Sequence, residues 1–370
     1  MNRRTRAVIM PRAFRNRIVA GRALPGGRPG KCGHDGRRLR LSGRSKSVEH
    51  RQGEMDVQQQ TRPRAARRTK KVRARLTVFG VLILVVLLVT VSAFAVVRSI
   101  APSKQDLLVR AGLQGKARLT IGVRDDLPGI ALCTSTCTGF DIDIAYAVAR
   151  ELGYPPDKVD LVPIEIEHRD DRQAKKDGGY ITVDLVVASY SITEQRVKEG
   201  VRFSSAYLET TQAVLTRSDF EGALESMAAL KGKKVCTLGA STAEGPLREL
   251  GIIPMGRFRI SDCVQRLKDG EYDAVQSDAA ILAGFVAQDP DTLRIHDITL
   301  DPAERWGIHT GPNDAMHTLV ELALHRITTS GEWRNLYAEH LAPAELVLKQ
   351  RQQVAIADPP AVPRPEIREW

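Results

Sequence analysis

The N-terminal part of the sequence has few acidic and few apolar residues. Residues 1–75 contain 23 Lys and Arg but only 4 Asp and Glu. Such a segment cannot bury enough apolar surface to offset its ordering entropy, so we expect a disordered arm. Residues 76–370 contain 32 basic and 40 acidic side chains, although the whole chain carries a net charge of +11. The positive charge thus belongs to the arm, and we expect no nucleic-acid partner for the folded part.

Charged residues are absent from Leu76 to Val97, a run of 22 residues, and a membrane span needs about 20. The basic stretch Arg62–Arg75 precedes this run, whereas only Arg98 and Lys104 follow it closely. By the positive-inside rule, the arm is cytoplasmic and everything after the run lies outside the membrane. We therefore expect a single-pass protein of the cell membrane with an extracellular domain.

Several alternatives stay open at the N-terminus. Ala93-Phe94-Ala95 has the small residues of a signal-peptide cleavage site. The apolar region of such peptides is about 7–15 residues long, however, so an uncleaved anchor is favoured. Translation could begin at Met55, because Arg62–Arg75 alone supplies a basic flank. The arm is most simply a solvated tail, and the alternative is a contact with anionic lipid or nucleic acid.

The chain has only five cysteines, and none follows the apolar run closely enough to indicate a lipid anchor. Cys32 lies in the arm. The other four lie in the exported part, where an even number predicts disulfides. The most local of the three possible pairings joins Cys133 to Cys137 and Cys236 to Cys263. No two of these cysteines are separated by two residues and no pair of histidines lies nearby, so we expect no metal site.

From about Lys116 to Leu341, β-branched runs alternate with amphipathic helices, which indicates an α/β fold. We expect a spacer at 98–115 before this region and a flexible, Pro-rich tail at 343–370 after it. The pattern indicates two similar α/β units. Because open α/β sheets bind ligands beyond the carboxyl ends of their strands, often between domains, we expect a ligand between the two units. The residues that follow the expected strands are Asp126, Ser189, Ser191, Ser241, Thr242 and Asp278.

These residue types suit a free amino acid, which presents a carboxylate beside an ammonium. Arg196 can pair with the carboxylate, and Thr193 three residues before it suits the start of a helix. Asp278 is the acidic candidate for the ammonium. Simpler explanations remain open, because Arg196 can be solvated on a helix turn and Asp278 can cap a strand end. Ser241 and Thr242 can likewise be an ordinary helix cap.

Several stretches in a fixed order carry a resemblance to a known family. They are Thr138–Asp143, Ala188–Arg196, Phe203–Tyr207, Val235–Thr237 with Ser241-Thr242, Tyr272–Gly284, Trp306–Ile308 and Gly331–Trp333. Over about residues 116–342, they resemble the bacterial extracellular solute-binding family for polar amino acids, family three, and especially its glutamate/glutamine/aspartate branch. The resemblance implies a periplasmic-binding-protein-like fold, with two α/β lobes that are joined by two crossover strands and close on a ligand. We expect lobe one at about 116–210 plus 305–342, and lobe two at about 211–304.

The resemblance also implies how the ligand is held. Arg196 and Ser191 would bind the α-carboxylate with help from Thr242. The Ser189 main chain and Asp278 would bind the ammonium.

Further roles and departures follow from the same resemblance. Asp126 would lie in the turn of lobe one that lines the cleft. Arg172 would face the ligand side chain, so glutamate or aspartate should bind better than glutamine or asparagine. The pair Cys236–Cys263 resembles a disulfide of the glutamate branch, whereas Cys133–Cys137 has no assigned counterpart. The branch usually has Thr-Asp-Asp where this chain has Ser277-Asp278-Ala279.

The favoured function is the capture component of an ABC-type amino-acid importer, whose partners are a small amino acid and a transporter permease. The alternative is a membrane-bound sensor that signals through the helix and the arm to a cytoplasmic partner. Deleting residues 1–54 separates the two, because only the sensor needs the arm. An enzyme such as a dehydratase or a peptidoglycan lyase is not expected, because the candidate residues include no nucleophile–base set. No cofactor is expected.

The apolar run generates a test of membrane attachment. The mature protein should stay in the membrane fraction after a high-salt wash, because about 20 buried apolar residues hold it there rather than charge. N-terminal sequencing of any soluble product is the check. A soluble species that begins near Val96 would show that Ala93-Phe94-Ala95 is cleaved.

Overall fold

A computed structural model describes residues 65–370, except 223, 297–302, 351–356, 358 and 369–370. Residues 1–64 of the predicted disordered arm therefore lie outside the described residues, whereas residues 65–75 are helical, which corrects the prediction of disorder for them. The first described element is helix α1 (Ala65–Ile100), which contains the apolar run. Its segment Arg75–Ala93 is the one stretch among the described residues that is long and apolar enough to cross a membrane. Helix α2 (Lys104–Arg110) follows within the predicted spacer.

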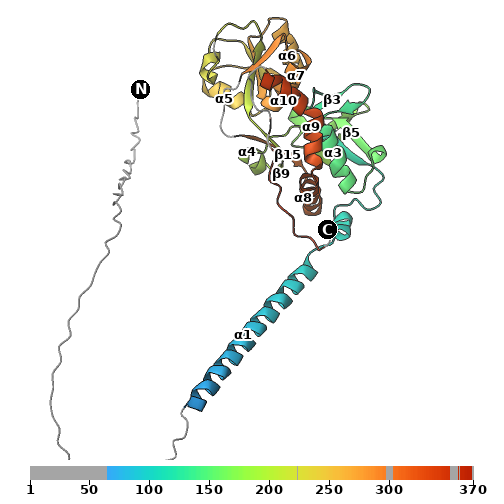
Figure 1. Ribbon diagram of the computed structural model, residues 1–370. Helices are drawn as coiled ribbons and strands as arrows, with labels where there is room; N and C mark the ends of the chain where they lie inside the picture. Colours follow the sequence, from blue (N-terminus) through green and yellow to red (C-terminus); the bar gives the residue numbers. More distant parts are fainter. Residues whose placement is uncertain (1–64, 223, 297–302, 351–356, 358, 369–370) are drawn as a thin grey trace, which may run out of the picture. The chain divides into compact units, whose positions relative to one another are not determined.

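Two five-stranded sheets form the centres of the two lobes (Figure 1). In lobe one the order is β5-β1-β8-β15-β9, with parallel pairing of β1 to β5 and β8. These strands are β1 (Leu119–Val123), β5 (Val159–Pro163), β8 (Leu185–Val187), β9 (Phe203–Thr210) and β15 (Glu304–His309). Its helices are α3 (Phe140–Glu151), α4 (Glu194–Lys198), α8 (Asp314–Thr329) and α9 (Glu332–His340). Short strands form two smaller sheets, which are β2 (Asp126–Leu127), β3 (Ala131–Cys133) and β4 (Cys137–Thr138), and β6 (Gln173–Lys176) with β7 (Gly179–Thr182).

In lobe two the strand order is β12-β11-β13-β10-β14. The strands are β10 (Gln212–Arg217), β11 (Val235–Leu238), β12 (Met255–Arg257), β13 (Ala274–Asp278) and β14 (Leu293–His296). The helices are α5 (Glu244–Glu249), α6 (Ile260–Lys268) and α7 (Ala279–Gln288). One crossover between the lobes is the direct passage from β9 into β10, and the other joins β14 to β15 through residues outside the described ranges. This arrangement confirms the predicted two-lobed α/β fold.

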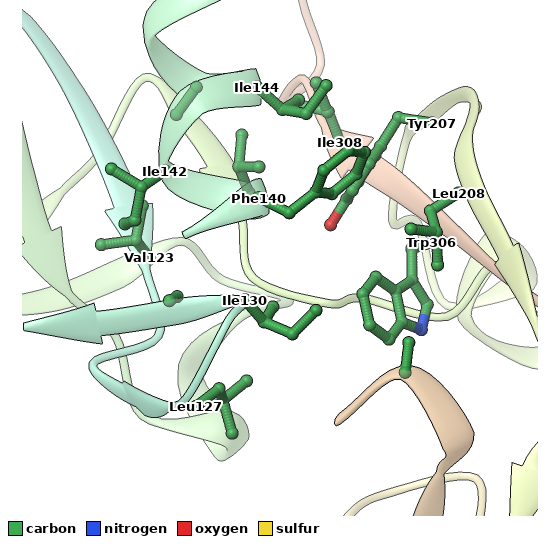
Figure 2. Close-up of a cluster of buried hydrophobic side chains, with 14 of the residues drawn as sticks. Val123, Leu127, Ile130, Phe140, Ile142, Ile144, Tyr207, Leu208, Trp306 and Ile308 are labelled. Carbon is green, nitrogen blue, oxygen red and sulfur yellow. The ribbon is translucent and has the colours of Figure 1, made fainter. Parts of the chain in front are cut away.

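Helix α3 shows how sequence pattern becomes packing in lobe one. Ile142, Ala145 and Ala149, which the periodicity places on one face, are all fully buried. Figure 2 shows Phe140 and Ile142 of this helix among the apolar side chains that also include Tyr207 and Trp306. The helix begins after Gly139, whose φ is 128° and whose added Cβ would lie 2.4 Å from the Ile130 carbonyl. Only glycine fits there, because an L side chain is strained at this φ and has no space.

Both predicted disulfides are present, Cys133–Cys137 across the β3–β4 hairpin and Cys236–Cys263 between β11 and α6. Cys236 and Cys263 are fully buried. In the chain-entropy account, closing the longer of these loops stabilises a protein by roughly 3–4 kcal/mol.

The predicted flexible tail is wrong at its start, because Ala342–Gln350 form helix α10. Ala344 and Leu348 lie four residues apart, so they share a face of the helix, and both are buried in the main hydrophobic cluster. The helix packs against α9 of lobe one and α7 of lobe two. The Pro-rich composition that suggested flexibility belongs to residues after 358.

Helix α10 generates a stability test with an internal control. Leu348→Ala should lower the free energy of unfolding by about 2–5 kcal/mol, because truncation of a buried leucine leaves a cavity. Leu346→Ala lies on the same helix but is 58% exposed, so its effect should stay within about 0.5 kcal/mol. Urea unfolding of residues 99–370, followed by tryptophan fluorescence, measures both. Equal effects would show that α10 does not pack as described.

Candidate functional site

A cleft lies where the carboxyl ends of β8, β11 and β13 face one another across the two lobes. Its inner part is a cavity of about 30 Å³, lined from lobe one by Arg169, Ser191 and Arg196 and from lobe two by Thr242 and Asp278, among others. Arg169, Arg196 and Thr242 also line an adjoining cavity of about 610 Å³. The inner volume is far below the roughly 300–1,000 Å³ of small-molecule sites. A ligand of amino-acid size therefore enters when the lobes separate or side chains move.

Arg196 is directed into the cleft by helix α4. Thr193 is the N-cap of this helix and its hydroxyl accepts from the Arg196 N–H at 3.2 Å, as the spacing predicted. The guanidinium donates to the carbonyls of Ser191 (2.8 Å) and Ala240 (3.0 Å), so it reaches from lobe one to lobe two. It lies 4.7 Å from the centre of the Tyr190 ring. Arg196 is thus held in place while its charge remains available to an anion.

Arg169 is the second cation of the cleft and is only 5% exposed. Its guanidinium donates to the carbonyls of Ala188 (3.2 Å) and Ser189 (3.4 Å) and stacks 4.3 Å from the Tyr190 ring centre. Burial, with Arg196 nearby, lowers the pKa of Arg169 to about 9. Across the described ranges, neither arginine has a carboxylate within salt-bridge distance. Two guanidiniums without anionic partners make the cleft an anion site.

The turn that carries Ser189 is fixed by a buried carboxylate. Asp141 accepts from the Ser189 N–H (2.8 Å) and hydroxyl (2.9 Å), and from the Tyr207 hydroxyl (2.9 Å). Burial raises the pKa of Asp141 to about 6, and these hydrogen bonds act against the rise. Ser189 has a positive φ of 46°. The Ser189 hydroxyl is therefore committed to Asp141, and Ser189 is among the residues that line the inner cavity.

Asp278 ends β13 and precedes α7, but it caps no helix with its side chain. It is 6% exposed, and its carboxylate accepts from the Trp306 indole N–H at 2.6 Å. Burial raises the pKa of Asp278 to about 8, the charge of Glu304 adds to the rise, and the Trp306 hydrogen bond and Arg169 oppose it. The raised pKa favours the protonated carboxyl, whereas a cation beside it favours the carboxylate.

Ser241 and Thr242 do not cap helix α5. The N-cap position is Ala243, which makes no side-chain cap. The Ser241 hydroxyl donates to the Leu238 carbonyl at 2.7 Å, and the Thr242 hydroxyl accepts from Gln212 at 3.2 Å. The simpler explanation as a helix cap is therefore wrong, and Thr242 lines both cavities.

Asp126 is close to the cleft but does not line either cavity. It pairs with Arg124 at 2.9 Å and accepts from the Ser261 hydroxyl of lobe two at 3.1 Å. Its neighbour Asp125 pairs with Arg259 of lobe two at 2.9 Å. These residues join the two lobes beside the cleft, and the predicted ligand contact of Asp126 is not supported.

Arg172 is also not brought to the cleft, which corrects the predicted contact with the ligand side chain. Its guanidinium donates to the carbonyls of Val183 (2.9 Å) and Asp184 (3.2 Å) and packs against Gly311. Arg169, three residues earlier, lines both cavities instead. A signal for this existed, because Ile166 precedes Arg169 by three residues, begins a short helical turn and is buried. Residues three apart on such a turn share a face.

One group of possible metal ligands lies outside the cleft in the described residues. Asp143 of α3 meets Glu339 and His340 of α9, and the His340 Nε2 lies 2.6 Å from the Asp143 carboxylate. Glu339 is exposed, and the His–Asp contact accounts for the pair as a link between the two helices.

Comparison with known proteins gives the family of this chain. Residues 119–343, more than half of the chain, match the family described as bacterial extracellular solute-binding proteins, family 3, and the chain belongs to this family. A glutamate-binding protein of Corynebacterium glutamicum is 29% identical over 244 residues, which are 63% of this chain and 81% of that protein. A glutamine-binding protein of Geobacillus stearothermophilus is 29% identical over 204 residues, 53% of this chain and 73% of that protein.

A solved structure of an ancestral arginine-binding protein bound to glutamine is similar with a TM-score of 0.54 and 28% identity, over 61% of this chain and 98% of that one. A membrane-bound lytic murein transglycosylase of Pseudomonas putida is 24% identical over 54% of this chain and 41% of its own length. The family is one of solute-binding proteins, and this chain resembles its amino-acid-binding members in both sequence and fold.

The state of Asp278 generates a pH test. Because its folded pKa lies above the unfolded value of 3.8, the folded protein holds an extra proton between about pH 4 and 8. Its contribution to stability is present at low pH and is lost as pH rises through this window. A ligand ammonium that pairs with Asp278 must displace that proton.

Titration calorimetry with L-glutamate at pH 7, in phosphate and in Tris, should therefore show release of up to about one proton for each ligand bound. Asp278→Asn should abolish the release. Binding enthalpies that do not depend on the buffer in the wild-type protein would contradict the assignment of Asp278 to the ammonium.

Proposed function

We propose that this protein captures an acidic amino acid, glutamate or aspartate, outside the cytoplasmic membrane for an ABC-type importer. The observation that carries the proposal is Arg169, a buried cation that has no carboxylate partner in the described residues. Arg196 suffices for the α-carboxylate of any amino acid. A second buried guanidinium in the same cleft calls for a second carboxylate, because a neutral amide would leave part of its charge uncompensated.

The remaining contacts follow from the positions of the polar groups. Arg196 pairs with the α-carboxylate, and Ser191 and Thr242 donate to it. Asp278 and the Ser189 carbonyl receive the ammonium. The ligand carries its carboxylate and its ammonium on neighbouring carbons. Arg196 of lobe one and Asp278 of lobe two pair with these two groups from opposite sides, so binding favours the arrangement in which the lobes are close together. The similarity to a glutamate-binding protein supports this ligand class.

The apolar segment of α1 supports a role for the helix as an uncleaved anchor, with residues 1–75 in the cytoplasm. A lobe pair held at the membrane surface reaches a permease by diffusion within the plane of the membrane alone. The second candidate is a sensor of amino-acid level, and the single helix joined to a long basic arm is the observation that favours it. Deletion of residues 1–54 should leave uptake intact in an importer and abolish signalling in a sensor.

The ligand assignment is tested by a matched pair of arginines. Arg169→Gln should weaken L-glutamate binding by about 2–5 kcal/mol, because the side-chain carboxylate loses its buried cation. It should affect L-glutamine less. Arg172→Gln removes the same charge three residues away, outside the cleft, and should bind L-glutamate like the wild type. Calorimetry on residues 99–370 measures all four combinations. Tighter binding of glutamine than glutamate by the wild type, or equal losses in both variants, would contradict the proposal.

A further inference from the structure

A chain of polar side chains lies beneath the cleft, on the strands where the lobes join. Gln212 is the first residue of β10, directly after a crossover, and it faces Asp278 in the register of β10 and β13. Its amide nitrogen donates to the Thr242 hydroxyl (3.2 Å) and to the Glu304 carboxylate (2.8 Å). Its amide oxygen accepts from Gln276 at 2.9 Å. Gln212 is only 4% exposed, so these partners replace water.

The partners determine which way the Gln212 amide points. An ionised carboxylate can only accept, so the amide nitrogen must face Glu304, and the donor from Gln276 requires the amide oxygen on the other side. The second N–H of the same nitrogen then points at Thr242. The Thr242 oxygen accepts this N–H, and its own O–H is left to donate. Among the described residues no acceptor takes that proton, and Thr242 lines the cavity.

Glu304 is also placed next to the ammonium subsite. It begins β15, and Trp306 lies two residues further on, so both side chains are on the same face of the strand. Trp306 donates to Asp278, which sets Glu304 on the side of the strand that faces Asp278. The other charged groups that act on Asp278 are Arg169 and Arg196, from lobe one, and their sign is opposite.

We propose that Glu304 is a positioning residue that acts through Gln212 to make the Thr242 hydroxyl a hydrogen-bond donor to the ligand carboxylate, and that its charge strengthens the ammonium subsite at Asp278. This inference rests on the proposed amino-acid function. It assigns one residue outside the cavity to both halves of the ligand. Because Glu304 and Gln212 lie on the two crossing points between the lobes, the donor is aligned only when those strands have the geometry seen here.

The first test is a double-mutant cycle on the full chain in detergent, with L-glutamate at pH 8.5, above the pKa of about 8 of Asp278. Glu304→Gln keeps the shape and removes the charge, so Gln212 can turn and Thr242 loses its fixed donor role. We expect binding to weaken about tenfold, as for one hydrogen bond to a charged group. Thr242→Val should weaken binding of L-glutamate by a similar factor. The double variant should bind about as weakly as Thr242→Val alone, because both changes remove the same hydrogen bond, and any further loss measures the effect of the Glu304 charge on the ammonium subsite at Asp278. Losses that multiply fully would overturn the relay.

Glu209→Gln is the matched control. Glu209 lies on β9 in the same sheet, close to the crossover, and has no hydrogen bond to Gln212 or Asp278 among the described contacts. Its neutralisation should leave the affinity unchanged. A loss equal to that of Glu304→Gln would show a general effect of charge and would overturn the specific role of Glu304.

A second measurement does not need a ligand, so it separates failure of this inference from failure of the proposed function. The melting temperature of the wild type should fall as the pH rises from 6 to 8, because Asp278 loses its proton. The melting temperature of Glu304→Gln should fall less over this range, because Asp278 ionises at lower pH without the charge of Glu304. In proteins that carry Asp278→Asn, the melting temperature should depend on pH in the same way with or without Glu304→Gln. If the wild type and Glu304→Gln also share one pH dependence while Asp278 is intact, the pairing of Glu304 with Asp278 is overturned. The expected melting behaviour without any amino-acid binding would support that pairing and reject the proposed ligand.

Discussion

Burial of charged groups in the cleft is the constraint on which the rest of the site depends. A charge removed from water is costly unless it is paired, neutralised or hydrogen-bonded. Asp278 meets this constraint through a raised pKa, which favours its neutral form, and by accepting from Trp306. Arg169 meets it through three backbone carbonyls and the face of Tyr190. Each arrangement is a substitute for a partner of opposite charge, and an acidic amino acid supplies both partners together.

The two lobes already touch across the cleft through direct protein contacts. Arg196 donates to Ala240, Asp126 accepts from Ser261, and Asp125 pairs with Arg259. Gly284 of α7 lies so close to Pro128 of lobe one that an added Cβ would be 1.9 Å from its carbonyl oxygen. These contacts favour the closed arrangement, whereas ligand entry requires space that the inner cavity lacks. Affinity therefore includes the free energy of an open–closed equilibrium as well as the contacts to the ligand.

Much of the fold and part of the site followed from sequence pattern alone. The strand ends close to Ser189, Ser241 and Asp278 could be predicted because short apolar runs end there and polar residues begin. The burial of the α3 face followed from its periodicity in the same way. Such signals are local, and they are read from residues near in sequence.

The failures have a common physical cause, which is that the deciding contacts are long-range. Arg169 and Arg172 are the same residue type in one polar stretch of the sequence. Only the packing of the turn after Ile166 buries Arg169, and not Arg172, in the cleft. The sequence around Thr242 is typical of a helix cap, but its hydroxyl accepts a hydrogen bond from Gln212, thirty residues earlier in the chain. Helix α10 was missed because its stability comes from α7 and α9 rather than from its own sequence.

The central claim, an acidic amino acid held between the two arginines of the cleft and a buried carboxyl, is tested most directly by a thermal-shift screen. Residues 99–370 would be heated with each of the twenty amino acids at pH 8, with glutarate as a ligand that has both carboxylates but no ammonium. A ligand at about 100 times its Kd stabilises the folded state by about 2.7 kcal/mol, which is readily measured. The account predicts the largest rise in Tm with glutamate or aspartate and a small one with glutamine and glutarate. No rise with any amino acid, or the largest rise with a basic one, would contradict it.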